Sequence, residues 1–172
     1  MKLSGRNLKR RLYGLKNLPD RVGRARYFRG HGVHSPFVYS IVREVFIVSE
    51  LKNSDQQLFH ALRSRNYVRR RAIELQNLYT HLGYKAFAID SLDEECDLCI
   101  LSESCSEEQT RAWVGEAAQS GKTVALLSPY IGRERQQFCQ ALIEAHHCTS
   151  VDNRGYILLF SDEKLPKQHY KL

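Results

Sequence analysis

Residues 71–103 read RAIELQNLYTHLGYKAFAIDSLDEECDLCILSE, and this stretch decides the fold class because a helical pattern runs directly into two short apolar segments. Apolar side chains recur at helical spacing up to residue 82, and Gly83 is typical of a helix C-terminus. The segments 85–90 and 96–103 have the length and apolar composition of buried strands. A helix followed by such strands predicts an α/β sheet.

The same alternation of helices and strands continues towards the C-terminus. Helical patterns at about 106–120 and 131–146 flank another apolar run at 123–130. Residues 148–162 predict two strands joined by a tight turn at 153–155. Strands separated by helices imply parallel pairing, whereas a hairpin adds an antiparallel edge. We therefore expect a shortened Rossmann-like three-layer α/β sheet of about five strands with a terminal antiparallel hairpin.

Helical patterns also precede this region. Ser35 followed by Pro36 is a strong helix start, and helical spacing of apolar residues continues to about Leu51. A second helical pattern, capped by Ser54 or Asp55, covers about 28 residues, which exceeds a typical globular helix, so we expect a break near 63–67. This organisation predicts a basic helical N-terminal extension and a truncated α/β domain, residues 1–54 and 55–172.

The net charge of +7 belongs to the N-terminal arm. Residues 1–30 hold ten Lys and Arg against one acid, whereas the remaining 142 residues carry sixteen basic and eighteen acidic side chains. Leucines at helical spacing predict an amphipathic helix over about 4–17. The arm contacts either a polyanion, nucleic acid or an anionic membrane surface, or it packs its leucines on its own domain. The candidate polyanion contacts are Lys9, Arg10, Arg11, Arg69, Arg70 and Arg71.

Composition and cysteine usage favour a reduced, cytoplasmic protein. The chain of 172 residues is 42% hydrophobic and 26% charged, as expected for a domain with a buried core. No apolar run reaches the roughly 18–20 residues of a membrane span, and the N-terminus lacks the apolar core of a secretory signal. The cysteines form an odd count of five, which suits free thiols. We therefore expect a cytoplasmic location and no transmembrane segment.

Two motifs could hold a metal ion or an anion. Cys96 and Cys99 form a CxxC pair, but residues three apart in a strand point to opposite faces, so a buried strand is favoured over a metal or redox site. His31 and His34 stand beside the helix start, without a nearby third metal ligand. Either this segment is a capped loop or it binds a phosphate or carboxylate, because helix N-termini attract anions. The candidate anion ligands are Arg29, His31, His34 and Ser35.

The order of elements resembles the class I S-adenosylmethionine-dependent methyltransferases. Residues 71–103 are similar to the helix that follows the second strand in that family and to its third and fourth strands. HGVHSPFVY at 31–39 and KLPKQHYKL at 164–172 are similar to a Bacteroidetes methyltransferase-like group with an RHGVHSPFV start. The resemblance covers most of the chain, and the histidine motif is its most specific part.

The chain departs from this family where the cofactor would bind. Only about eight residues join QLFHAL at 57–62 to RAIELQNL at 71–78, too few for the glycine-rich loop and the first two strands. No residue can therefore be carried over as a cofactor ligand. We expect the equivalents of the third and fourth strands to pair directly. Glu103 and Tyr130 follow strands and form a candidate remnant cleft.

These departures predict a degenerate methyltransferase-like protein, a pseudoenzyme without cofactor that acts as a binding or scaffold partner of another protein or of a second copy. One alternative is an active methyltransferase that binds S-adenosylmethionine at a rebuilt or subunit-shared site. The other is a nucleic-acid-binding module that uses the basic arm.

Overall fold

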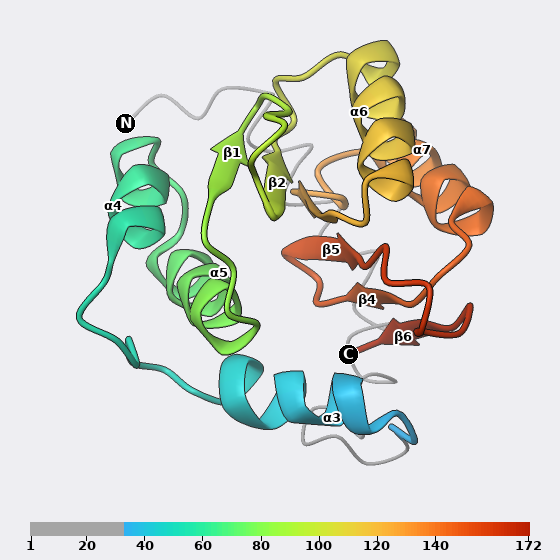
Figure 1. Ribbon diagram of the computed structural model, residues 1–172. Helices are drawn as coiled ribbons and strands as arrows, with labels where there is room; N and C mark the ends of the chain where they lie inside the picture. Colours follow the sequence, from blue (N-terminus) through green and yellow to red (C-terminus); the bar gives the residue numbers. More distant parts are fainter. Residues whose placement is uncertain (1–32) are drawn as a thin grey trace.

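A central sheet lies between two layers of helices in the computed structural model of the chain (Figure 1). The structure describes residues 33–172, and the sheet within them has six strands. This mixed α/β arrangement is compatible with the Rossmann-like fold expected from the sequence. The helix expected over residues 4–17 lies outside the described residues, and so do Lys9, Arg10, Arg11, Arg29 and His31.

The sheet has a parallel half and a half with antiparallel pairing. Its strands are β1 (Phe87–Ile89), β2 (Leu98–Leu101), β3 (Thr123–Leu127), β4 (Ser150–Asp152), β5 (Tyr156–Leu159) and β6 (His169–Lys171). Their order across the sheet is β1-β2-β3-β5-β4-β6. β1, β2 and β3 are parallel, β5 runs antiparallel to both β3 and β4, and β6 is parallel to β4.

β6 is a strand that the sequence did not predict. Its three residues, HYK, have no apolar alternation, and their side chains are partly or fully exposed. The predicted hairpin is confirmed as β4 and β5, but β6 follows it and occupies the edge of the sheet. The expectation that the hairpin ends the sheet was therefore wrong.

β1 and β2 pair directly, as expected from the sequence. Phe87 lies opposite Leu98 and Ile89 opposite Ile100. Only residues 90–97 connect the two strands, and they contain no helix. Parallel neighbours usually need a dozen or more residues with a crossover helix. The connection is therefore unusually short, and no helix N-terminus follows the carboxyl end of β1.

One face of the sheet is covered by four helical segments (Figure 1). They are α3 (Pro36–Ile41), the π-helical turn η2 (Val42–Phe46), α4 (Gln57–Ser64) and α5 (Arg69–His81). The helix expected to reach Leu51 ends at Phe46, but the break expected near 63–67 is confirmed. Asn66 makes that break with a left-handed φ of 63°, a conformation that asparagine tolerates. The N-cap of α4 is Gln56, rather than the Ser54 or Asp55 that the sequence suggested.

The other face is covered by α6 (Glu107–Gln119) and α7 (Arg133–Ala145). Ser106 begins α6 with a complete capping box, because its hydroxyl accepts from the N–H of Gln109 at 3.1 Å and the Gln109 side chain returns to Ser106. Gly121 follows α6 with a φ of 69°, which only glycine adopts at low cost. Within residues 33–172, no helix combines the length and the apolar composition that crossing a bilayer requires.

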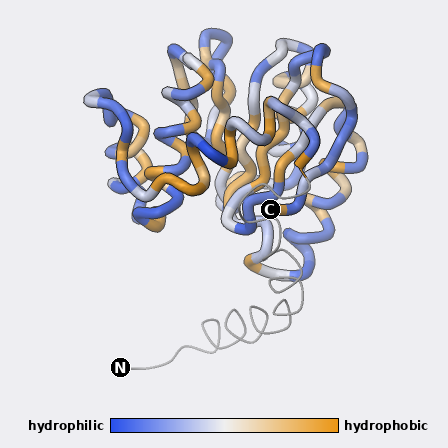
Figure 2. Tube along the Cα trace, turned by 90° about the horizontal axis from the view of Figure 1, so that it is seen from below, coloured by the Kyte–Doolittle hydropathy of each residue, from blue (hydrophilic) through white to orange (hydrophobic). Residues whose placement is uncertain are grey.

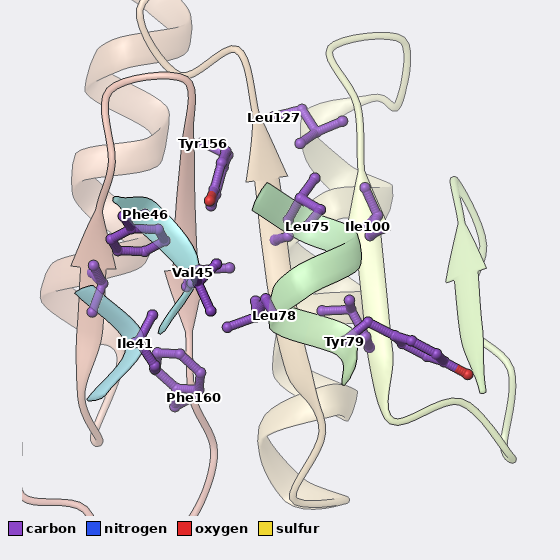
Figure 3. Close-up of a cluster of buried hydrophobic side chains, with 14 of the residues drawn as sticks. Ile41, Val45, Phe46, Leu75, Leu78, Tyr79, Ile100, Leu127, Tyr156 and Phe160 are labelled. Atoms are coloured by element: carbon purple, nitrogen blue, oxygen red, sulfur yellow. The ribbon is translucent and has the colours of Figure 1, made fainter. Parts of the chain in front are cut away.

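Alternate residues of the buried strands supply the two hydrophobic cores. Leu98 and Ile100 of β2 pack towards α3, η2, α4 and α5, whereas Cys99 and Leu101 pack towards α6 and α7. Figure 3 shows side chains of α5, including Leu75, close to side chains of the strands and of η2. Figure 2 shows hydrophobic residues concentrated in the central strands. Every residue of β2, β3 and β5 is buried, as in a sheet covered on both faces.

Candidate functional site

Polar residues follow the parallel strands at their carboxyl ends, where open α/β sheets bind ligands. Asp90 follows β1, Ser102 follows β2 and Ser128 follows β3. Asp90 and Ser128 have left-handed φ values of 56° and 52°, so the chain turns sharply as it leaves both strands. This edge of the sheet is therefore a candidate location for a ligand site.

Asp90 is hydrogen-bonded within the chain. Its Oδ1 accepts from the N–H of Ser102 at 2.7 Å and from the thiol of Cys105 at 3.3 Å. Its Oδ2 lies 3.4 Å from the guanidinium of Arg65. The N–H of Ser104 donates to Ser102 Oγ at 3.1 Å. Acceptors and donors at the ends of β1 and β2 are therefore used to hold these two loops together.

The thiol of Cys105 belongs to the same cluster and is held in its neutral form. Burial raises its pKa, and the hydrogen bond to Asp90 raises it further because the thiol is the donor. A thiol with a raised pKa is a poor nucleophile at neutral pH. Cys105 therefore contributes a hydrogen bond to this loop rather than a reactive group.

A cavity of about 500 Å³ opens beside this cluster, between α5, the end of β3 and the turn between β4 and β5. We call it the α5 cavity. Its lining comes from the first turns of α5, from the residues just before α5, from the residues after β3 and from the β4–β5 turn. The lining residues are Leu62, Tyr67, Val68, Arg71, Ala72, Leu75, Leu127, Ser128, Tyr130, Ile131, Arg154 and Gly155.

A buried carboxylate, Glu74, holds Arg71, which lines the α5 cavity. It is only 3% exposed and accepts from Arg70 Nε at 2.8 Å and from Arg71 at 2.6 Å. Asn153, in the turn after β4, also donates to Glu74, at 3.1 Å. The guanidinium of Arg71 lies 5.8 Å from the ring centre of Tyr156. This Glu74 network ties the first turns of α5 to the β4–β5 turn.

The β4–β5 turn is shaped around Arg71. A Cβ at Gly155 would lie 2.7 Å from Cζ of Arg71 and closer still to its Nε, so only glycine lets the side chain approach. Arg154 has a left-handed φ of 57°, and its N–H donates to Asp152 Oδ1 at 2.9 Å. The hydroxyl of Tyr130 donates to Asp152 Oδ2. Asp152, which is buried, thus joins the turn to the residues that follow β3.

Tyr156 is the largest buried side chain of this region. Complete burial raises the pKa of its hydroxyl well above the usual value, and the nearby carboxylate of Glu74 acts in the same direction. The hydroxyl accepts from Asn153 at 3.1 Å. The side chain is therefore neutral at physiological pH and supports the Glu74 network by packing and hydrogen bonding.

Of the two residues that the sequence placed in a remnant cleft, Tyr130 lines the α5 cavity, whereas Glu103 is exposed and does not line it. Ser35 caps α3 by accepting from the N–H of Val38 at 3.3 Å, and His34 beside it is exposed. These side chains are spread over different parts of the fold.

The three arginines at 69–71 have different environments. Arg69 is exposed, whereas Arg70 and Arg71 pair with the buried Glu74 of the same helix. The sequence analysis did not select Glu74, although its spacing of three and four from the arginines is typical of ion pairs on a helix. It also missed Asp90 and Arg154, which only the fold brings into place.

The CxxC pair is packed in the core. Cys96 and Cys99 both belong to the cluster beneath α6 and α7, so the expectation that they point to opposite faces was wrong, because Cys96 precedes the first residue of β2. Burial raises the pKa of Cys99 to about 12. No three His, Cys, Asp or Glu residues of the described part of the chain group as metal ligands do.

A second hollow, of about 620 Å³, lies at the opposite edge of the sheet. Thr123, at the start of β3, lines it together with Asp162, Glu163 and Lys164. The amino ends of parallel strands are not where α/β folds usually bind ligands. The α5 cavity is therefore the better candidate site.

Comparison of the chain with protein families, with curated proteins and with solved structures finds no match. The resemblance to methyltransferases therefore stays a prediction from sequence motifs.

Proposed function

We propose that this protein is a binding protein built on a methyltransferase-like sheet, and that it does not transfer methyl groups. The observation that carries this proposal is that both carboxylate oxygens of Asp90 already have partners within the chain. A dinucleotide or adenosyl cofactor needs an acid at a strand end for the ribose hydroxyls. Asp90 stands at such a position, but Ser102, Cys105 and Arg65 already occupy its oxygens.

The backbone at this edge supports the same proposal. Nucleotide-binding α/β folds present free N–H groups at a glycine turn that opens a helix. Here residues 90–97 join β1 to β2 without a helix, and the N–H groups of Ser102 and Ser104 donate within the chain. A cofactor at this position would have to break those hydrogen bonds.

The proposed binding role involves another protein, or a second copy of this chain, in the cytoplasm. The surface around the exposed start of α5, which includes Arg69, is one contact region in this proposal. The described residues carry sixteen basic and eighteen acidic side chains, so nucleic-acid binding would depend on the ten basic residues of 1–30. Loss of salt-dependent RNA binding on deletion of residues 1–28 would support the nucleic-acid alternative.

Calorimetric titration of the full chain with S-adenosylmethionine tests the proposal. The expected result is no heat of binding at cofactor concentrations up to about a millimolar. Saturable binding with a micromolar Kd would overturn the proposal and favour an active methyltransferase with a rebuilt site. A reference titration with an established methyltransferase at the same protein concentration ensures that the absence of heat is meaningful.

A further inference from the structure

The second hollow lies close to the point where the described chain begins, and we call it the Phe37 hollow. Val33, the first described residue, packs against the core on the α3 side of the sheet, and Phe37 lines the hollow four residues later. Four peptide units span at most about 15 Å. The segment 1–32, which lies outside the described residues, therefore joins the domain beside this hollow.

One part of the lining is apolar and aromatic. Phe37 meets Phe160 edge-on, with the ring centres 4.9 Å apart. Leu82, Tyr84 and Leu165 line the same hollow and are only partly buried, so apolar surface stays accessible there. Accessible apolar side chains around a hollow are typical of interaction sites.

The rest of the lining has a negative electrostatic character. α6 ends here with Gln119 in the lining and has no basic residue in its last turn, and α5 ends here with Leu82 as its C-cap. Helix C-termini carry the negative end of the helix dipole and attract cations. Asp162, Glu163 and Lys164 add two carboxylates and one ammonium group, so the formal charge of the lining is −1.

Both carboxylates of the hollow are accessible to a partner. Asp162 and Glu163 are exposed, and within residues 33–172 neither of them forms an ion pair. Asp162 Oδ1 accepts from the backbone N–H of Lys164 at 2.9 Å, which shapes the turn without neutralising the charge. A basic partner would supply the counter-charges that the described residues do not.

The N-terminal arm of the same chain has both properties that this surface favours. Its residues 1–30 hold ten Lys and Arg against one acid. Leu8, Leu12 and Leu15 have spacings of four and three, so they share one face of the helix expected over 4–17. The arm therefore offers apolar side chains and cations together.

The connection is long enough for the arm to reach the hollow. The chain from Leu18 to Val33 can span up to about 50 Å when it is extended. A folded domain of this size has a radius of gyration of only about 15 Å. Covalent attachment also gives the arm an effective concentration of about a millimolar at the hollow. Docking within one chain is therefore favoured over docking on a second copy.

We propose that residues 3–18 of the N-terminal arm dock in the Phe37 hollow of their own chain. The leucines pack against the apolar side chains of the lining, and basic side chains of the arm face Asp162 and Glu163. In this arrangement the cations of the arm also offset the C-terminal ends of α5 and α6. This inference goes beyond the proposed function, because Asp90 and its hydrogen-bond partners do not line the hollow.

Amide NMR spectra of the full chain and of two variants test the docking. Leu12→Asp places an acid on the leucine face and should release the arm, so the amides of Gly121 and Ser161 in the lining are expected to move. Asn17→Asp makes the same change in charge on the opposite side of the expected helix, and it should leave both amides in place. The amide of Ser128, in the α5 cavity, is the reference and should not move in either variant.

Zero-length cross-linking identifies the chain on which the arm docks. A carbodiimide couples a lysine amine to a carboxylate that it contacts, so Lys9 or Lys16 should become linked to Asp162 or Glu163. In an equal mixture of unlabelled and ¹⁵N-labelled chains, both linked peptides are expected to come from one chain. Leu12→Asp keeps these reactive groups and should lower the yield of the link at least fivefold.

Unmoved amides of Gly121 and Ser161 in Leu12→Asp would overturn the proposal. An equal movement in Asn17→Asp would also overturn it, because the lining would then respond only to the charge of the arm. Links found only between labelled and unlabelled chains, or no link at all, would contradict docking within one chain. Binding of S-adenosylmethionine in the same preparation would overturn the proposed function but leave the docking of the arm standing.

Discussion

Glu74→Gln removes a buried carboxylate that joins α5 to the β4–β5 turn, and we expect it to lower the free energy of unfolding by about 2–4 kcal/mol. Glu74 is 3% exposed and accepts from Arg70 at 2.8 Å, Arg71 at 2.6 Å and Asn153 at 3.1 Å. Hydrogen bonds to charged groups contribute about 1.5–3 kcal/mol each. Glutamine keeps one acceptor oxygen, so only part of the set is lost.

Solvent access keeps the loss below the sum of these terms. The side chains of Arg70 and Arg71 are 37% and 30% exposed, so water can replace part of their lost bonds. Removing one partner of a fully buried pair costs about 3–5 kcal/mol, which sets the upper end of the expected range. For a chain of this size the loss corresponds to a fall in Tm of roughly 5–12 °C.

The assay is urea unfolding followed by circular dichroism, with the m-value checked for constancy. Glu116→Gln on α6 is the matched control, since Glu116 is exposed, and its effect should stay within about 0.5 kcal/mol. A loss in Glu74→Gln below about 1 kcal/mol would refute the reasoning, because the network would then not hold the turn in place.

Three further predictions concern the strand ends, the turn and pH. Asp90→Ala should lower stability by about 2–3 kcal/mol in urea unfolding, because Ser102 N–H and Arg65 lose their acceptor and alanine must adopt a left-handed φ; a neutral effect would contradict the structural role of Asp90. Gly155→Ala should displace Arg71 and cost about 1–3 kcal/mol, and a crystal structure of the variant with Arg71 unmoved would disprove the contact. Burial lowers the pKa of His146, against the opposing hydrogen bond to Phe160, so its stabilising effect is complete above the unfolded-state pKa of about 6.5 and is lost as pH falls below it. Chemical unfolding at pH 7 and pH 5 should show this loss, which His146→Gln should reduce and His147→Gln, an exposed neighbour, should not.

Local sequence signals predicted most elements of the fold. The break at 63–67 and the tight turn between β4 and β5 depend on residues close in sequence, and both are confirmed. β6 has no such signal, because its sequence HYK shows no apolar alternation. It forms a strand through its pairing with β4. The helix expected to reach Leu51 ends at Phe46, where Arg70 of α5 donates to the Phe46 carbonyl.

The candidate site was harder to predict because it is assembled from distant segments. Tyr130 was selected for its place after a strand, and it does line the α5 cavity. Asn153 and Glu74 are 79 residues apart in sequence, yet the turn between β4 and β5 brings Asn153 to Glu74 and Gly155 to Arg71. No periodicity or motif in the sequence predicts such a contact. The sequence predicted the edge of the sheet at which a site could lie. It did not predict which polar side chains at that edge are hydrogen-bonded within the chain.

Backbone amide NMR of the full chain during titration with S-adenosylhomocysteine tests the central claim most directly. If the ends of β1 and β2 are closed by the chain itself, the amides of Ser102 and Ser104, which donate to Asp90 and to Ser102 Oγ, keep their chemical shifts throughout. Saturable movement of these two amides would contradict the account, since it would place the nucleoside where Asp90 now holds the loop.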